Sequence, residues 1–195
     1  MGNLTFEIKR KFFHVAMLGY ILIYIFILNS TGSRAIGVLS LGIILVLFII
    51  IEYYRIHKGL KIPFFGKLWR KEEKRIWGGE IYYMIGVIVA LLFFDFKIAL
   101  TAIFMLAFGD SVATIVGLSS GKTKLKTKKK KTLQGSTAEL ITNLIVGYLI
   151  LRSWTLVIPM ALAATLAETY SNKIDDNLAI PIYAGAIGQL VRFLI

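Results

Sequence analysis

Asp110 is an acidic residue inside a long apolar run, within the segment Ala107-Phe108-Gly109-Asp110-Ser111-Val112-Ala113-Thr114. An unpaired carboxylate at this depth of a bilayer costs about 3 kcal/mol or more, so it requires a compensating partner. Thr114 and Gly117 follow at i+4 and i+7 and share its helical face. One interpretation is a structural ion pair with a lysine or arginine of a neighbouring helix. The other is a metal-binding or phosphate-facing catalytic site, the usual role of an intramembrane acid.

A second group of oxygen ligands follows the sixth predicted helix, at Asp175, Asp176 and Asn177. Two carboxylates and an amide in one turn are hard ligands that suit Mg²⁺ better than zinc. Glu168 stands seven residues before Asp175 and faces the same way if the helix continues. The turn is therefore a candidate magnesium site, and the alternative is a solvated turn that caps the last helix.

The loop 118–135 is strongly basic and punctuated by glycines. The spacing from Gly117 to Lys122 is one residue short of the phosphate-binding loop of nucleotide hydrolases, and a spanning helix stands where that motif requires a strand. Backbone amides near Gly121 and Gly135, together with several lysines, are nevertheless suited to a triphosphate. The candidates for phosphate binding in and beside this loop are Lys122, Lys131, Thr132, Gly135 and Ser136. The alternative is a patch for anionic lipid headgroups, whereas nucleic acid is disfavoured because no base-stacking aromatic residue interrupts the run.

Charged residues also form a stripe where the first predicted helix enters the membrane. Glu7, Arg10, Lys11 and His14 stand at i, i+3, i+4 and i+7, on one helical face. The stripe is either an anchor held by salt bridges on the positive side of the membrane, or a phosphate clamp. In the second case His14 is a candidate proton acceptor near the interface.

The start of the fifth predicted helix, Ser136-Thr137-Ala138-Glu139, has the spacing of a capping box. It predicts that Ser136 is the N-cap, with Glu139 three residues further on. Glu139, Asn143 and Gly147 then follow at four-residue intervals. This polar stripe is expected to face the interior of a helix bundle.

The elements that position these residues are membrane helices, as the composition indicates. Of 195 residues, 57% are apolar and only 17% are charged, and the mean hydropathy is +0.73. A soluble domain is nearer a quarter charged. The chain contains no cysteine, which excludes disulfides, thiolate metal sites and cysteine nucleophiles.

A spanning helix needs about 20 mostly apolar residues. The chain offers seven such segments, with cores at 12–28, 35–51, 80–94, 98–117, 137–151, 154–170 and 178–194. The prediction is an all-α, polytopic helical bundle formed by one catalytic domain over residues 1–195. The loops 52–79 and 118–135 carry most of the basic residues, and the first of them is expected to lie in the membrane interface.

The net charge is +12, and the basic residues are distributed unequally between the two sides. With seven spans, one side collects 19 lysines and arginines and the other only four: Arg34, Lys97, Arg152 and Arg192. Positive residues concentrate in cytoplasmic loops. The N-terminus is therefore expected in the cytoplasm and the C-terminus outside, with the chemistry on the cytoplasmic face.

Four motifs in this order resemble the CTP-dependent lipid-alcohol kinases, a family that includes dolichol kinase, phytol kinase and the CTP-using diacylglycerol kinase. They are Glu7-x-x-Arg10-Lys11-x-x-His14, Gly109-Asp110-Ser111-x-Ala113-x-x-x-Gly117, Lys131-Thr132-x-x-Gly135-Ser136-x-Ala138, and Glu168 followed by Asp175-Asp176-Asn177 and Pro181. The resemblance spans nearly the whole chain. It implies an integral membrane kinase that transfers the γ-phosphate of CTP, with Mg²⁺, to a hydroxyl at the end of a lipid.

Carried over onto matching positions, the resemblance implies that Arg10, Lys11, Asp110 and Gly117 are required for activity. It also implies that the segment from Lys131 to Ser136 and the turn from Asp175 to Asn177 line the nucleotide site. Phosphoryl transfer needs alignment and charge neutralisation above all. The resulting hypothesis gives Mg²⁺ to the oxygen ligands Asp110, Asp175, Asp176, Asn177 and Glu168. It gives the phosphates to Lys122, Lys131, Arg10 and Lys11, and the proton of the lipid hydroxyl to His14 or Glu139.

The acceptor expected from the resemblance is a polyprenol or dolichol-type alcohol, with diacylglycerol as an alternative. A phosphatidate cytidylyltransferase also uses CTP, Mg²⁺ and a membrane lipid, and composition does not separate it from a kinase. A small ion-coupled transporter is the third alternative. It is disfavoured because the acids cluster near the cytoplasmic ends of the helices and no inverted repeat is apparent.

Overall fold

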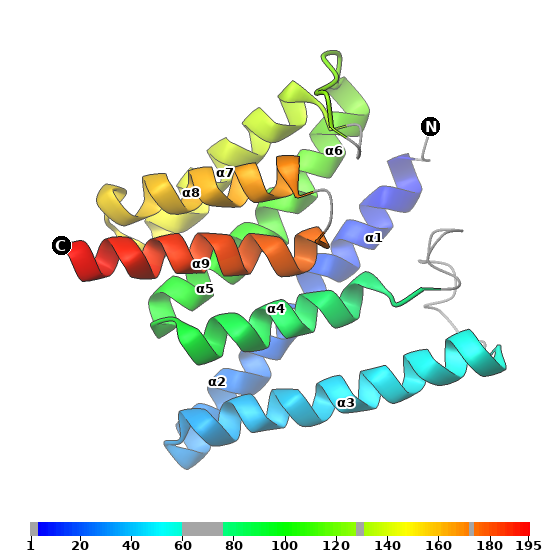
Figure 1. The fold of residues 1–195 in the computed structure, drawn as a ribbon, viewed down its shortest axis with the longest axis vertical. Coiled ribbons are helices and arrows are strands. Elements are labelled where there is room, and N and C mark those ends of the chain that lie inside the picture. Colours follow the sequence, from blue (N-terminus) through cyan, green and yellow to red (C-terminus); the bar gives the residue numbers. More distant parts are fainter. Residues whose placement is uncertain (1–3, 60–75, 128–130, 172–173) are drawn as a thin grey trace.

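The computed structural model describes residues 4–59, 76–127, 131–171 and 174–195, and these ranges are almost entirely helical (Figure 1). Within them α1 is followed almost directly by α2, and α5, η3 and α6 run on without a break, so the described segments form seven rods. The only pairing of extended residues in these ranges is an isolated antiparallel bridge between Lys124 and Thr132. The segments are α1 (Leu4–Ala16), α2 (Gly19–Thr31), α3 (Arg34–Lys58), α4 (Gly79–Phe93), α5 (Phe96–Phe104), the π-helical η3 (Met105–Gly109), α6 (Asp110–Ser120), α7 (Leu133–Leu151), α8 (Trp154–Tyr170) and α9 (Asp176–Leu194).

Four of these rods are long and apolar enough to cross a membrane: Leu4–Thr31, Arg34–Lys58, Phe96–Ser120 and Asp176–Leu194. The helix Gly79–Phe93 is apolar but shorter. The prediction of an all-α membrane bundle is thereby confirmed. The count of seven spans and the sides on which the termini lie stay predictions. The predicted loop 52–79 begins too early, because residues 52–58 belong to α3. Its interfacial position stays a prediction, because residues 60–75 lie outside the described ranges.

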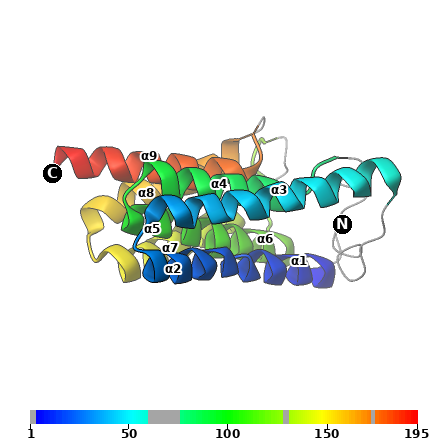
Figure 2. The ribbon, with the colours of Figure 1, turned by 90° about the horizontal axis from the view of Figure 1, so that it is seen from below.

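The rod formed by α5, η3 and α6 is the centre of the bundle, and two-thirds of its most apolar stretch, 67%, is buried. Helices α4, α7, α8 and α9 pack around it, and α1 packs along α6. Figure 2 shows α1 and α2 along one face of the molecule and α3, α4 and α9 along the other, with α5 between them. Large side chains such as Phe12, Phe26 and Phe93 are each 72% exposed, as expected of surfaces that face lipid.

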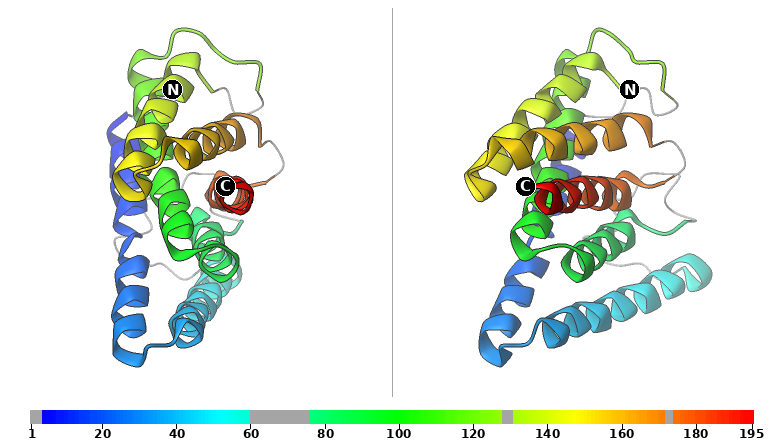
Figure 3. Two further views of the ribbon diagram at one scale, coloured as in Figure 1. Left: turned by 90° about the vertical axis from the view of Figure 1, so that its left-hand side faces the viewer. Right: turned by 60° about the vertical axis from the view of Figure 1, so that its left-hand side comes forward.

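The rods alternate in direction, so the two ends of the bundle differ in their connections. The tight turns 32–33, 94–95 and 152–153 gather at one end with the C-terminus (Figures 1 and 3). The start of α1, the end of α3 and the loop between α6 and α7 lie at the other end, with the start of α9. We call these the turn end and the loop end.

Polar residues at the turn end are paired in structural contacts. Arg34 donates through Nε to the carbonyl oxygen of Leu91 at 2.9 Å and through a terminal nitrogen to that of Phe94 at 2.5 Å. Both carbonyls belong to the C-terminal end of α4, which leaves such oxygens without helical partners. Asp95 pairs with Arg192 at 3.1 Å, so this end holds the start of α3, the end of α4 and α9 together.

Candidate active site

A cavity of about 1090 Å³ opens at the loop end of the bundle. Its walls come from α1, α2, α3, α4, α6, α7, α8 and α9, and from the segment before α7. Among the described residues, those that carry charged or polar side chains into its lining include Glu7, Arg10, Lys11, His14, Glu80, Asp110, Lys131, Thr132, Ser136, Glu168, Asp175, Asp176 and Asn177. The four sequence motifs, far apart in the chain, therefore meet at one cavity.

Asp110 lies at the junction of η3 and α6 and is 5% exposed. Its carboxylate accepts a hydrogen bond from Nζ of Lys11, which reaches it from α1. His14 Nε2 lies 3.6 Å from the same carboxylate oxygen. The ion pair predicted for an intramembrane acid is therefore present, and its partner is a residue of the charged stripe on α1.

Close packing against α7 accompanies the π-helical turn before Asp110. A Cβ at Gly109 would lie 2.2 Å from the side-chain oxygen of Asn143 on α7. The absence of a side chain lets α7 approach the centre of the bundle at this point. A π-helical bulge frequently accompanies a functional site, because it redirects the side chains that follow it.

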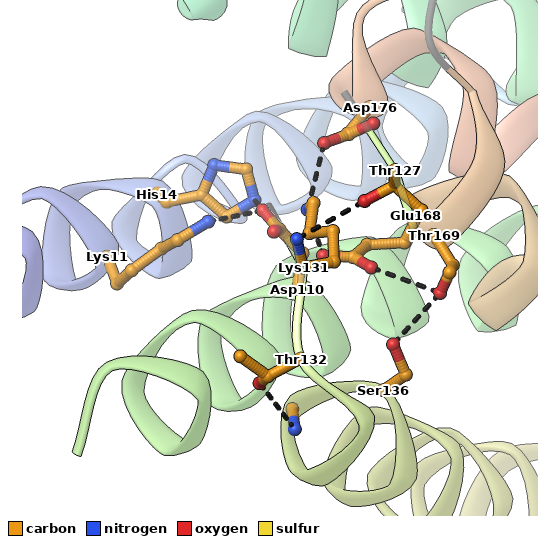
Figure 4. A network of polar contacts seen from close by, with 11 residues as sticks. Lys11, His14, Asp110, Thr127, Lys131, Thr132, Ser136, Glu168, Thr169 and Asp176 are labelled. Atoms are coloured by element: carbon orange, nitrogen blue, oxygen red, sulfur yellow. Dashed lines mark hydrogen bonds and ion pairs between the residues drawn. The ribbon is translucent and has the colours of Figure 1, made fainter. Parts of the chain in front are cut away.

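Lys131 is the centre of a second charged cluster, shown with the first in Figure 4. Its Nζ donates to Oε1 of Glu168 and lies 3.3 Å from Oδ2 of Asp176. Burial alone would lower the pKa of Lys131, but the Glu168 and Asp176 carboxylates outweigh it and hold the pKa above its ordinary value. Lys131 is therefore a fixed cation beside Asp110 (Figure 4).

Thr132, not Ser136, caps α7, so the predicted capping box is wrong. The helix begins at Leu133, and the Thr132 side chain accepts a hydrogen bond from the backbone N–H of Gly135 at 3.2 Å. Ser136 already lies inside the helix and its hydroxyl contacts that of Thr169 at 3.0 Å. Both residues have a hydroxyl suited to capping, and the isolated bridge at Thr132 decides where the extended chain ends.

The glycines of the motifs allow α6 and α7 to cross closely. A Cβ at Gly135 would lie 2.8 Å from the carbonyl oxygen of Ala113, and one at Gly117 would lie 3.1 Å from Oγ1 of Thr132. This crossing brings the segment that carries Lys131 against the helix that carries Asp110. The geometry gives Gly117 and Gly135 a packing role, while both also line the cavity.

Lys122 does not reach the cavity, in contrast to the prediction. It is exposed, and it does not belong to the described residues that line the cavity. Its backbone N–H and that of Thr123 both donate to the side-chain oxygen of Gln134, at 3.1 and 3.2 Å. These amides hold the loop against α7, so they do not form the predicted phosphate cradle near Gly121.

The predicted oxygen ligands of Mg²⁺ face the same cavity but do not form one metal cage. The described residues contain no group of three or more His, Asp or Glu arranged to hold a metal ion. Lys11 and Lys131 each occupy carboxylate oxygens of the set. Asp175 caps α9 by accepting from the backbone N–H of Asn177 at 3.0 Å, as the alternative interpretation of this turn predicted.

A protein cage is not what Mg²⁺ requires at a nucleotide site. The ion commonly keeps several waters and binds through one or two carboxylates together with substrate phosphates. Asp175, Asp176 and Asn177 line the cavity at the start of α9, with Glu168 beside them. The oxygen donors therefore fit an ion that arrives with a triphosphate, and not one held by protein ligands alone.

Glu139 lies in the buried interior and not on the cavity wall. Its side chain is fully buried, and it is not among the described residues that line the cavity. The predicted inward-facing stripe is confirmed, because Asn143 and Gly147 are buried on the same helix. A role of Glu139 in direct contact with a substrate is not supported by this position.

Sequence reasoning missed one side of the cavity. Phe13, Met17, Tyr20, Ile23 and Phe48 line it together with the charged groups. These residues fall within the first two predicted spans, where apolar side chains carry no signal of their own. Tyr83 was also missed, and its ring meets that of His14 edge to face at a centroid distance of 4.9 Å.

Comparison with known proteins finds relatives among lipid kinases. The chain is 29% identical over 143 residues to the "CTP-dependent diacylglycerol kinase 1" of Schizosaccharomyces pombe, covering 65% of this chain and 66% of the relative. It is 32% identical over 135 residues to the "Probable phytol kinase, chloroplastic" of Triticum aestivum, covering 60% of this chain and 44% of the relative. The "Probable phytol kinase 2, chloroplastic" of Oryza sativa is 25% identical over 204 residues, covering 95% of this chain and 66% of the relative.

The chain is therefore similar to proteins named as CTP-dependent diacylglycerol kinases and as phytol kinases. The matched region spans about half to two-thirds of the length of these relatives. No family model matches the chain, and no solved structure matches it either.

Proposed function

We propose that this protein is an integral membrane kinase that transfers the γ-phosphate of CTP to the hydroxyl of a lipid alcohol. The observation that carries the proposal is one cavity that joins fixed cations, carboxylates and an apolar wall. The names of the relatives, CTP-dependent diacylglycerol kinase and phytol kinase, support the donor and the class of acceptor. A polyprenol or dolichol-type acceptor is our first choice, and diacylglycerol is equally compatible with these names.

The cations are proposed to hold the triphosphate. Lys131 and Lys11 present ammonium groups beside Asp110, and Arg10 lines the same cavity. The transition state of phosphoryl transfer is stabilised mainly by positioning and by neutralisation of phosphate charge. Lys131 and Lys11 are already fixed by carboxylates, so little reorganisation is needed when the phosphates bind.

The carboxylates at the start of α9 are proposed to hold Mg²⁺ together with the phosphates of CTP. Asp175, Asp176 and Asn177 supply oxygen donors there, and Glu168 lies beside them on α8. When bound, the ion would neutralise charge on the β- and γ-phosphates. Asp110 remains a candidate for the same ion, because it faces the same cavity.

His14 is the proposed acceptor of the hydroxyl proton, and the Asp110 carboxylate beside it is proposed to stabilise the imidazolium that forms. The imidazole Nε2 lies 3.6 Å from the Asp110 carboxylate, and both side chains line the cavity. A general base must reach the proton it removes. His14 satisfies this condition better than Glu139, which lies behind the cavity wall.

The active site is proposed to open to the cytoplasm, because the described helix ends that flank the two basic loops of the sequence lie at the loop end. Exposed lysines such as Lys122, Lys124 and Lys126 would contact anionic lipid headgroups there. The orientation of the site and its contact with anionic lipids are both inferred from the distribution of charge in the sequence. Reconstitution with nucleotide supplied on one side only would test the orientation.

The direct experiment uses purified protein in nanodiscs with CTP labelled at the γ-phosphate. A polyprenol, phytol and a diacylglycerol are offered in parallel, and lipids are separated by thin-layer chromatography. We expect the label on a lipid monophosphate, with Mg²⁺ required and ATP a poorer donor. Label in pyrophosphate would indicate a cytidylyltransferase instead, and no label in lipid or pyrophosphate would contradict the proposal.

A further inference from the structure

The apolar side of the cavity is a continuation of the charged site and not a separate pocket. Phe13, Met17, Tyr20 and Ile23 line it from the first rod, and Phe48 lines it from α3. We call these five residues the apolar arm. The same cavity contains Asp110 and Lys131, so a ligand that occupies both parts has a polar end and an apolar end.

The backbone at the junction of α1 and α2 aligns the residues of the arm. Between Ala16 and Gly19 the hydrogen bonds change from i−4 to i−3: Leu18 N–H donates to Val15 at 3.0 Å, and Tyr20 N–H to Met17 at 3.0 Å. Side chains at i and i+3 are eclipsed in this tighter turn. The turn therefore places Tyr20 above Met17, and the arm continues the cavity-facing stripe that begins with the charged residues of α1.

The arm extends away from the loop end, toward the middle of the expected membrane. Ile23 lies nine residues beyond His14 on the first rod, which corresponds to about 13 Å at 1.5 Å per residue. Figure 3 shows α1 and α3 diverging from the turn that joins α2 to α3. Phe48 meets Tyr20 edge to face at a centroid distance of 6.2 Å, and these rings form the wall between the two rods.

The outer end of the arm reaches the surface that faces lipid. Ile23 is 38% exposed, and its neighbours Leu22 and Phe26 are 70% and 72% exposed. The polar end of the cavity, in contrast, holds Asp110 and Glu168 at 5% and 1% exposure. A molecule that lies along the cavity thus passes from a charged, enclosed end to an apolar end open to the bilayer.

From this arrangement we infer that the apolar arm binds the hydrocarbon chain next to the hydroxyl of the acceptor alcohol. The inference rests on the proposed function and deepens it, because it assigns the residues that recognise the lipid. An amphiphile seated there places its chain against Met17, Tyr20 and Phe48 and its hydroxyl near His14 and Asp110. Selection among acceptors then depends on the chain and its first branches, which contact these side chains.

Photolabelling tests the arm without requiring catalysis. The wild-type protein in nanodiscs is incubated, without nucleotide, with a long-chain primary alcohol that carries a diazirine in the middle of its chain. We expect labelled peptides that contain Met17, Tyr20 or Phe48, and loss of label when the unlabelled alcohol is added in excess. Phosphatidylcholine in the same excess is expected to leave the label in place.

Labelling mainly at outward-facing positions such as Phe12 and Phe26 would overturn the inference, whatever the protein's activity. Equal displacement by phosphatidylcholine would also overturn it, because the arm would then be occupied by bulk lipid. A protein that is labelled in the arm but transfers no phosphate would contradict the proposed function alone. The two proposals are therefore distinguishable.

A matched pair of variants provides the kinetic test. Phe48→Ala removes a wall of the arm. Leu47→Ala removes an apolar side chain from the preceding position of α3, which is 54% exposed and not in the described lining. We expect Phe48→Ala to lower the preference for a long-chain over a five-carbon alcohol by about tenfold, as for loss of one buried apolar contact. Leu47→Ala is expected to keep the wild-type preference, and equal ratios in both variants would contradict the assignment.

Discussion

The two ends of the bundle use charged residues in opposite ways. At the turn end, Arg34 donates hydrogen bonds to backbone carbonyls at the end of α4. Asp95 pairs there with Arg192, and their side chains are 41% and 52% exposed. At the loop end, Lys11 and Asp110 pair with side chains only 7% exposed, beside a cavity. The ion pair at the turn end is exposed to solvent, whereas the ion pair at the loop end is buried.

This difference indicates where function lies. A buried ion pair contributes little net stability, because desolvation of both charges offsets most of their attraction. A buried ion pair beside a cavity is therefore better explained by a functional role than by a contribution to folding stability. An exposed pair at the turn end contributes little as well, but its desolvation cost is small.

The largest contrast is expected from removal of one acid at each end. Asp110→Asn takes away the charge that fixes Lys11 and faces His14, and we expect phosphate transfer from CTP to fall about a thousandfold. Asp95→Asn, the matched change at the turn end, is expected to alter activity less than twofold. The rate is measured with labelled CTP, and thermal unfolding verifies that both variants are folded. Similar activities of the two variants would remove the distinction between the ends.

The second contrast lies within the loop end, between two lysines. Lys131→Met removes the cation that Glu168 and Asp176 hold, and we expect activity to fall about a hundredfold with a higher KM for CTP. Lys122→Met removes the same charge from an exposed loop position and is expected to change activity less than threefold. Lys131→Arg should restore part of the loss, because it keeps the charge but not the shape. Equal effects of the two methionine variants would indicate a general effect of loop charge.

A smaller effect is expected from the close crossing of α6 and α7. Gly135→Ala places a methyl group 2.8 Å from the carbonyl oxygen of Ala113, so the helices must move apart. We expect a loss of about 1–3 kcal/mol in stability and about tenfold in activity. Gly42→Ala on α3 meets nothing within 4 Å and is expected to keep the wild-type activity without loss of stability, since alanine favours a helix over glycine. An active, stable Gly135→Ala would show that the crossing is not needed.

The smallest effect on catalysis is expected at the turn end itself. Arg34→Ala leaves the carbonyls of Leu91 and Phe94 without their donor, and we expect stability to fall by about 1–3 kcal/mol. Activity per folded molecule is expected to remain within twofold of the wild type. Thermal unfolding and the rate with labelled CTP separate the two quantities. A large loss of activity in a folded Arg34→Ala protein would show that the two ends are coupled.

Much of the fold could be predicted from the sequence because the bilayer requires long apolar runs. Each of the seven predicted cores falls on a helical rod, and the described helix ends that flank the two basic loops lie at the loop end, as the alternation requires. The first rod was predicted as one helix, and the tight turn between Ala16 and Gly19 was missed because the apolar run continues through it. The sequence predicted Ser136 as the N-cap of α7 because the capping motif is a local pattern. The actual cap, Thr132, pairs with Lys124 eight residues away, and no local pattern indicates this bridge.

The candidate site was predicted in part, for a reason that differs between its residues. Asp110 was predicted from the cost of a charge in an apolar run, Glu168 from its spacing to Asp175, and Lys131 from the basic loop. The structure brings all three to one cavity. Lys122 and Glu139 carry the same functional groups as Lys131 and Glu168, respectively. However, Lys122 faces the solvent and Glu139 the bundle interior. The spacing of residues in the sequence predicts which side chains share one face of a helix, but not which other helix or cavity that face contacts.

The sequence by itself determined the membrane bundle, the concentration of basic residues in two loops and the acid, Asp110, whose burial demands a partner. These follow from transfer free energies, which depend on residue type and on the length of an apolar run. Only the tertiary structure decided that Lys11 pairs with Asp110 and Lys131 with Glu168, and that five apolar side chains complete the cavity. Which side chains pair depends on which helices cross. The glycines permit a close crossing because they let two helix backbones approach each other, and this distance exists only in the folded protein.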